Sequence, residues 1–166
     1  GQMAVGLTSK YLGDKGIEKD PAVVFAEDFE EGDLEALWSR WENVQSKELM
    51  SLSADVPATS GGRRSLLMTH IGGQSNGGHL YRRLLRGYEK LHVRFYVKFD
   101  LDCYPIHHFV HLGGYNPPTA WPQGGAGTRP KGDERLSTGV EPHGDEWRWD
   151  FYSYWMGMRS SPDGRS

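Results

Sequence analysis

Cysteine is almost absent from this chain, in which Cys103 is the single one among 166 residues. A lone cysteine cannot form an internal disulfide, so cysteine usage does not indicate a redox compartment. An excess of one charge is also lacking, because 19 basic and 22 acidic side chains leave a net charge of -3. A balance this even is atypical of nucleic-acid-binding proteins and of polybasic membrane-surface proteins. The sequence therefore predicts neither a nucleic acid nor a membrane as the partner.

Long apolar runs and familiar catalytic motifs are lacking as well. No segment approaches the roughly 20 apolar residues that span a bilayer. The opening GQMAVGLTSK has no apolar stretch of the kind found in a signal peptide. The sequence contains no GxSxG elbow, P-loop, HExxH or EF-hand pattern. The glycines at 124–127 do not lie between a strand and a helix, so they do not indicate a phosphate-binding loop.

Glycine, proline and aromatic residues are plentiful, with 22 Gly, 9 Pro and 12% aromatics. Turn-rich and aromatic-rich composition favours an all-β fold over a helical one. We expect residues 1–22 to form an irregular N-terminal arm and residues 23–166 to form a single domain. The chain stops at the turn-like SSPDGRS. The domain is therefore predicted to continue beyond residue 166 or to end in a disordered tail.

Two segments alternate apolar and polar residues with the period of a half-buried strand, KLHVRFYVKFD at 90–100 and WRWDFYSYWMGM at 147–158. The spacing of Leu34, Leu37, Trp38 and Trp41 predicts a short helix within 33–41, with Asp33 as its N-cap. A long Gly/Pro loop is expected at 113–135. Further strands are predicted at 23–30, 43–52, 64–70, 79–86, 106–112 and 137–142.

The polar faces of the two alternating strands carry an unusual set of side chains. Strand alternation places the apolar residues of each segment, including Trp147, Trp149, Phe151 and Trp155, on the core side. The opposite faces then present His92, Arg94, Tyr96 and Lys98 from one strand, and Arg148, Asp150, Tyr152 and Tyr154 from the other. Two interpretations remain open: a solvated face with cross-strand pairs, or a groove for an anionic or polyhydroxylated chain.

Three histidines fall within the predicted strand 106–112. His107 and His111 share a face but stand about 13 Å apart at roughly 3.3 Å per residue, and His108 points to the other face. One zinc ion cannot bridge the first two, so these residues alone do not predict a zinc site. A general base, a substrate hydrogen bonder and a structural histidine are the alternatives. Glu141 and Asp150 are the candidate carboxylate pair if the chain is a glycoside hydrolase.

The segment from 25 to 159 resembles the concanavalin-type jelly-roll proteins that include polysaccharide lyases and their secreted relatives. The resemblance lies in FAEDFEEGD, SGGRRSLLM, LHVRFYVKFD, HHFVHLGGY and WRWDFYSYW, taken in this order. It implies an antiparallel β-sandwich with a concave groove, and a secreted or periplasmic monomer. It also implies a structural calcium ion held by Glu30, with backbone oxygens of the loop 60–63 as further ligands.

The same resemblance implies binding of an acidic polysaccharide, with cleavage by β-elimination if the protein is an enzyme. That chemistry needs a group that neutralises the sugar carboxylate, a base and an acid. Arg94 is the expected neutralising group, His107 or His111 the base, and Tyr152 or Tyr154 the acid. A non-catalytic lectin and a glycoside hydrolase on the same fold are the alternatives. The side chains expected to hold the sugar chain are Arg83, His92, Tyr96, Lys98, Tyr115, Trp121, Glu141 and Arg148.

Overall fold

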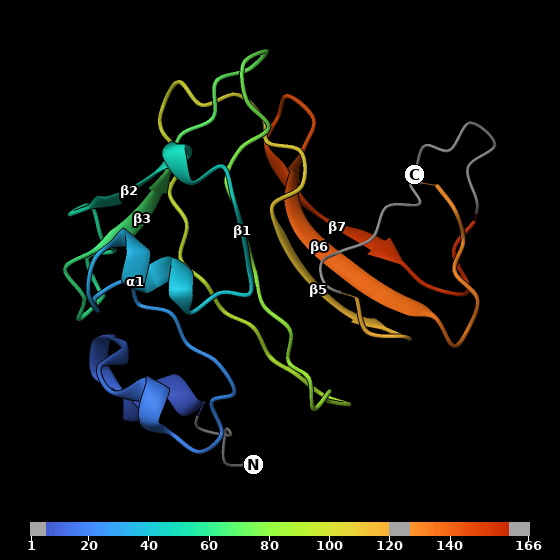
Figure 1. The fold of residues 1–166 in the computed structure, drawn as a ribbon, viewed down its shortest axis with the longest axis horizontal. Coiled ribbons are helices and arrows are strands. Elements are labelled where there is room, and N and C mark those ends of the chain that lie inside the picture. Colours follow the sequence, from blue (N-terminus) through green and yellow to red (C-terminus); the bar gives the residue numbers. More distant parts are fainter. Residues whose placement is uncertain (1–5, 120–126, 160–166) are drawn as a thin grey trace. The chain divides into compact units, whose positions relative to one another are not determined.

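The computed structural model describes residues 6–119 and 127–159, and divides the chain into two compact units, 1–82 and 83–166. Its strands form small antiparallel sheets, and helices are few and short (Figure 1). The chain is therefore β-rich, as its composition predicts. The single domain predicted for 23–166 stays a prediction. Within the described residues, none of the helices combines the length and apolar character that crossing a bilayer requires.

The first unit begins with three 3₁₀ helices, η1 (Leu7–Lys10), η2 (Leu12–Asp14) and η3 (Ile17–Lys19). The arm predicted for residues 1–22 stays a prediction, and these short helices lie within it. The helix α1 (Leu34–Ser39) follows, and the Asp33 carboxylate accepts a hydrogen bond from the Ala36 amide at 3.0 Å. The predicted helix and its N-cap are thus confirmed, because both depend on local spacing alone.

Two small sheets complete the first unit. The strands β1 (Asn43–Gln45) and β4 (His79–Tyr81) pair with each other, and β2 (Met50–Ser53) pairs with β3 (Ser65–Met68). The predicted strand 43–52 is interrupted because Ser46 adopts a left-handed conformation and the 3₁₀ helix η4 (Lys47–Leu49) follows it. The helix α1 lies against β2, and Leu37 and Met50 are the buried apolar side chains there.

The strand predicted at 23–30 is wrong. Phe29 has a positive φ of 62°, which a strand does not tolerate. The Glu27 carboxylate accepts from the amide of Phe29, and the Asp28 carboxylate accepts from the amide of Glu30, each at 3.0 Å. Such local side-chain bonds use backbone groups that a ladder would otherwise need.

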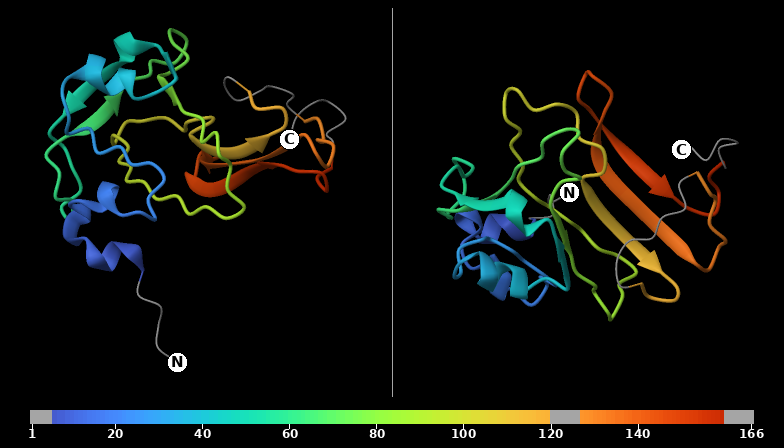
Figure 2. Two further views of the ribbon diagram at one scale, coloured as in Figure 1. Left: turned by 60° about the horizontal axis from the view of Figure 1, so that its bottom comes forward. Right: turned by 45° about the horizontal axis from the view of Figure 1, so that its top comes forward.

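The second unit contains one three-stranded antiparallel sheet. Its order is β5 (Val110–Tyr115), β6 (Arg135–His143) and β7 (Arg148–Tyr154), with β6 in the middle (Figures 1 and 2). The strands predicted at 137–142 and 147–158 are confirmed, although β6 begins two residues earlier than expected. The strand predicted at 106–112 is displaced, because β5 starts at Val110.

The segment 90–100 takes part in no ladder with the described residues. Its side chains are half-buried at Leu91, Phe95 and Phe99, whereas Val93 and Val97 are 56% and 40% exposed. The alternation of this segment therefore predicts a strand that the structure does not contain. Alternation reports which side chains prefer burial, whereas a strand also requires a hydrogen-bonding neighbour.

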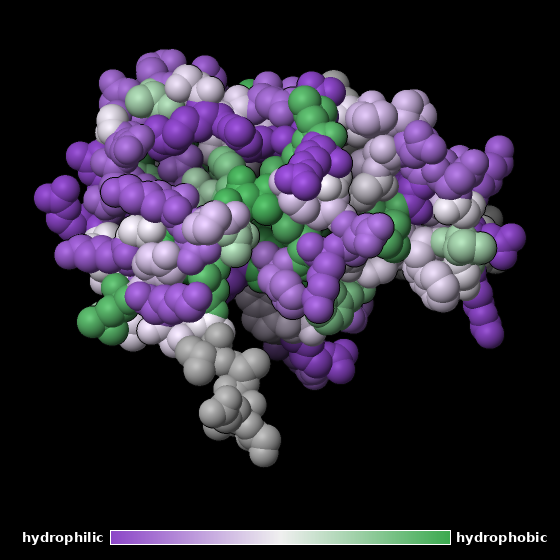
Figure 3. Space-filling model, turned by 90° about the horizontal axis from the view of Figure 1, so that it is seen from below, coloured by the Kyte–Doolittle hydropathy of each residue, from purple (hydrophilic) through white to green (hydrophobic). Residues whose placement is uncertain are grey.

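The two faces of the β5–β7 sheet differ in chemistry, as the alternation of 147–155 predicts. The apolar face carries Leu136, Trp149 and Phe151, and Phe99 packs against the Trp147 and Trp149 rings with centroids at 4.7 and 5.9 Å. The apolar face is less buried than the polar face of the same sheet, since Phe151 is 72% exposed whereas Tyr154 is 3% exposed. The expectation that it faces a core is wrong for these residues. Hydrophobic atoms accordingly reach the surface among hydrophilic ones (Figure 3).

Candidate functional site

The polar face of the β5–β7 sheet gathers most of the side chains predicted to be catalytic. The strand register places His111 opposite Gly139, and Gly139 opposite Tyr152. Glu141 stands opposite Asp150 on the same face, because residues two apart in a strand point the same way. The division of 147–155 into two faces is therefore confirmed, and the polar face becomes the candidate site.

Glu141 is the centre of this site. Its residue is 6% exposed, and its Oε2 atom is buried without a hydrogen-bond partner among the described residues. A buried carboxylate is costly unless other charges or donors compensate it. The groups around Glu141 therefore decide how this cost is offset.

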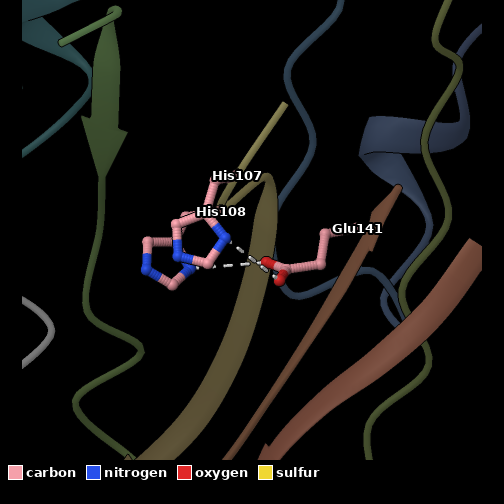
Figure 4. A group of neighbouring side chains, drawn as sticks. All are labelled: His107, His108 and Glu141. Atoms are coloured by element: carbon pink, nitrogen blue, oxygen red, sulfur yellow. Dashed lines mark ion pairs between the residues drawn. The ribbon is translucent and has the colours of Figure 1, made fainter. Parts of the chain in front are cut away.

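Three histidines surround the Glu141 carboxylate. The Nδ1 atoms of His107 and His108 lie 3.9 and 3.4 Å from its two oxygens, and the Nε2 atom of His111 lies 3.8 Å from Oε2. Figure 4 shows His107 and His108 side by side, both facing the carboxylate. These separations exceed the 2.7–3.2 Å of an N–H···O hydrogen bond, so the four groups are close neighbours without direct bonds.

The backbone before β5 explains why His107 and His108 face the same way. His108 has a positive φ of 64°, and the strand begins only at Val110. Strand alternation does not apply to this stretch, and the two imidazole rings lie with centroids 3.8 Å apart. The expectation that His108 points away from its neighbour is therefore wrong. His107 and His111 also lie near the same carboxylate, 3.9 and 3.8 Å from its two oxygens, although a continuous strand would hold them about 13 Å apart.

His111 lies directly over the middle strand. A Cβ atom at Gly139 would come within 2.6 Å of the His111 ring, so only glycine allows this approach. Burial lowers the pKa of His111 below its usual value of 6.5, with the positive charge of His108 as the next cause. The neutral form of this imidazole, which can accept a proton, is accordingly favoured.

Two tyrosines complete the cluster. The Tyr152 ring lies 5.3 Å from the His108 ring, and its hydroxyl is 2.7 Å from the Tyr154 hydroxyl. Tyr154 is 3% exposed, and its hydroxyl accepts a hydrogen bond from the Gly127 amide at 3.1 Å. Of the two predicted acids, Tyr152 is thus the more accessible, and Tyr154 fixes the position of its hydroxyl.

Arg135 is a site residue that sequence reasoning misses. Its guanidinium carbon lies 4.0 Å from the centre of the Tyr154 ring, and its Nε donates to the Ser137 hydroxyl at 3.0 Å. Residues 135, 137, 139 and 141 point to the same face of a strand. This alternation would predict Arg135 as a site residue if the strand predicted at 137–142 began two residues earlier. His108 is the other residue missed, and no signal in the sequence announces its left-handed backbone.

The remaining predicted binding residues have other neighbours. Arg94 donates to the Tyr96 hydroxyl at 2.6 Å and lies over that ring. Tyr115 lies 5.7 Å from the Arg135 guanidinium carbon, and the Arg148 side chain lies 3.6 Å from Glu146. Trp121 is outside the described residues. The segment 83–100, outside the ladders, contains Arg83, His92 and Lys98.

Glu30 belongs to the first unit, where it contacts the loop that the family resemblance implies. The expected contact is a calcium ion shared with backbone oxygens of this loop. Instead, the Glu30 Oε1 atom accepts hydrogen bonds from the Arg63 and Arg64 amides, the latter at 2.7 Å. The Arg63 side chain lies 3.6 Å from Oε2. These donors lower the pKa of Glu30, the Arg63 amide being the largest cause. A carboxylate engaged by amides and a cation does not fit a calcium ion, which requires oxygen ligands.

One group of side chains in the described residues has the composition of a metal site. The donor atoms of His107, His108 and Glu141 all lie within 4.8 Å of one another. Comparison of the chain with protein-family models, with curated proteins and with solved structures gives no match. What the site does must therefore be argued from its own geometry.

Proposed function

We propose that the polar face of the β5–β7 sheet binds an acidic polysaccharide and cleaves it by β-elimination. The observation that carries this proposal is the convergence of His111, Tyr152 and Tyr154 on one side of one sheet. The proposal includes the finer fold, a jelly-roll β-sandwich in a secreted or periplasmic protein. The apolar face of the sheet supports the sandwich, because such a face packs against a second sheet about 10 Å away.

Each chemical role has a candidate on this face. His111, held in place over Gly139, removes the proton at C5 of the uronate. The electron pair forms the C4–C5 double bond, the C4–O bond breaks, and Tyr152 protonates the departing oxygen. His107 is the alternative base. Arg135 lies next to Tyr154 and carries a positive charge. It can therefore neutralise the sugar carboxylate, which is the role that the sequence predicts for Arg94.

The experiment is incubation of the protein with alginate, glucuronan, heparin and pectate, followed by ultraviolet absorbance of the unsaturated product. Absorbance should rise with one polymer, and Tyr152→Phe or His111→Ala should abolish the rise. Tyr104→Phe is the matched control, because it removes a hydroxyl from a side chain that is 87% exposed. Retention on a polysaccharide gel without any rise would replace the lyase by a lectin.

A glycoside hydrolase is the second candidate, and one observation favours it. Glu141 and Asp150 are directly opposite in the register of β6 and β7, which brings their Cβ atoms to about 4.5–5.5 Å. Glycosidases need two carboxyl groups within reach of one sugar bond, which a directly opposed pair of side chains allows. New reducing ends without ultraviolet absorbance, in the same incubation, would identify this activity.

The calcium ion near Glu30 stays a prediction of the family resemblance. The amide donors around Glu30 argue against it, as described above. Its test is the melting temperature with and without EDTA, after calcium has been added. A lower melting temperature in EDTA that only calcium restores would support the ion.

A further inference from the structure

We propose that His107, His108 and Glu141 form a binding site for one divalent transition-metal ion, for which zinc is the best match. We further propose that the open coordination position of this ion holds the carboxylate of the acidic sugar. This second part rests on the proposed function, whereas the metal site itself does not.

The distances between the donor atoms suit a shared cation. Ligand atoms of a tetrahedral zinc ion, each bonded at about 2.0–2.2 Å, stand about 3.3–3.6 Å from one another. The His108 Nδ1 atom already lies 3.4 Å from Glu141 Oε2, and the His107 Nδ1 atom lies 3.9 Å from Oε1. Both histidines lie before the first residue of β5, where no ladder restrains them. The donor atoms lie within 4.8 Å of one another, so the two exposed rings must move closer to the carboxylate to share one ion (Figure 4).

The unpartnered oxygen of Glu141 is the independent observation. Its Oε2 is buried and accepts no hydrogen bond among the described residues, although the His108 and His111 imidazoles lie 3.4 and 3.8 Å away. The gaps are too long for hydrogen bonds, so the histidines alone do not satisfy this atom. A metal ion between the carboxylate and the two rings satisfies it, because one cation then accepts electron pairs from all three groups.

The chemistry of the donors selects the kind of ion. Imidazole nitrogens suit zinc and its transition-metal neighbours, whereas calcium and magnesium prefer oxygen ligands throughout. Three protein ligands leave a fourth position open, as in catalytic rather than structural zinc sites. His111 stands outside the group of mutually close donors. It therefore remains available as the base.

The ion also resolves an electrostatic difficulty of the proposed function. A buried carboxylate at the centre of the site repels the carboxylate of a uronate. A divalent cation bound to Glu141 reverses the local charge and offers a Lewis-acid contact to the sugar carboxylate. The ion thereby takes the neutralising role that the sequence predicts for Arg94.

The test begins with zinc alone, in competition with a chromogenic chelator, on untagged full-length protein first stripped with EDTA. One zinc ion per chain should bind. His108→Ala and Glu141→Gln should each weaken binding at least tenfold. His70→Ala is the control, since it removes an exposed imidazole of the first unit. Equal affinity in all four proteins, or no binding to the wild type, would overturn the site. His108→Ala keeps the test decisive if the buried Glu141→Gln does not fold.

A second arm separates the metal site from the proposed function. Retention of the stripped protein on a uronate gel should be lost and should return with zinc but not with calcium. Zinc binding with retention that does not depend on zinc would overturn the sugar contact and leave the metal site in place. Zinc binding without any retention or cleavage would refute the proposed function together with the sugar contact.

Discussion

Replacement of Gly139 by alanine tests the packing that positions His111. The new Cβ atom would stand 2.6 Å from His111 Cε1 and 2.9 Å from Nε2, whereas such atoms normally approach to about 3.5–4.0 Å. Gly139 lies within β6 and is not among the positive-φ glycines, so alanine suits its backbone. The clash with the ring is therefore the main effect of the substitution.

The magnitude follows from two opposing contributions. Overpacking of this kind typically costs about 1–3 kcal/mol, and the loss of glycine freedom in the unfolded chain returns about 0.4–1 kcal/mol. The half-exposed ring can swing outward, so we expect Gly139→Ala to lower the free energy of unfolding by about 1–2 kcal/mol. The same swing removes the base from the sheet, so uronate cleavage should fall strongly.

Gly114 supplies a matched control in the neighbouring strand. A Cβ atom there would meet nothing within 4 Å, and its side chain would point to the other face of the sheet. Gly114→Ala should therefore leave stability unchanged or raise it by up to about 1 kcal/mol. Urea denaturation followed by tryptophan fluorescence measures both variants. If the two alanines have the same effect, or if His111→Ala does not relieve Gly139→Ala, the clash is not the cause.

Three further predictions concern single contacts. Arg40→Ala should lower the free energy of unfolding by about 2–3 kcal/mol in a urea titration. It leaves the Glu27 side chain, 6% exposed, without the guanidinium that pairs with both its oxygens. The same hydrogen bonds to Glu27 raise the pKa of Arg40, and an added Glu27→Gln should restore part of the loss. The pKa of Glu30 is lowered from 4.5, so Glu30 stabilises the fold above that pH and less as pH falls through its folded value. The stability difference from Glu30→Gln should therefore shrink below about pH 4, and a constant difference would contradict the assignment. Tyr154→Phe should cost about 1–2 kcal/mol because the Gly127 amide loses its acceptor, and cleavage should fall without vanishing; complete loss would make Tyr154 the acid.

Local patterns predict a helix or strand of this chain well where the residues of that segment alone determine its structure. The α1 helix is predicted by apolar spacing and by Asp33, whose cap bond lies within the same turn. β7 is predicted by its alternation, and the faces of Tyr152 and Phe151 follow from strand parity. In each case the information lies within a few residues of the element itself.

The predictions fail where a structure depends on a partner strand far away in the sequence, or on a residue with an uncommon backbone conformation. The alternation at 90–100 is as regular as that of β7, yet no described strand pairs with it. Phe29 and His108 both adopt positive φ, which is uncommon outside glycine and has no signature in the sequence. The sequence names His107, His111, Tyr152, Tyr154 and Glu141 as separate candidates. Their meeting around Glu141 follows only from the register of β6 with its neighbours and from the left-handed backbone of His108.

The state of Glu141 decides between the proposed chemistries, because they require it in incompatible forms. A metal site needs an ionised carboxylate that coordinates the ion, whereas a glycosidase needs it free to act on the sugar with Asp150. Asp150 is exposed and is not among the mutually close metal donors. Asp150→Asn should therefore leave zinc affinity and β-elimination unchanged while abolishing any hydrolysis. Glu141→Gln should weaken zinc binding at least tenfold and abolish both cleavage reactions. If Asp150→Asn instead removes cleavage and Glu141→Gln leaves zinc affinity intact, the pair of carboxylates is the catalytic unit and the histidines serve only to hold it.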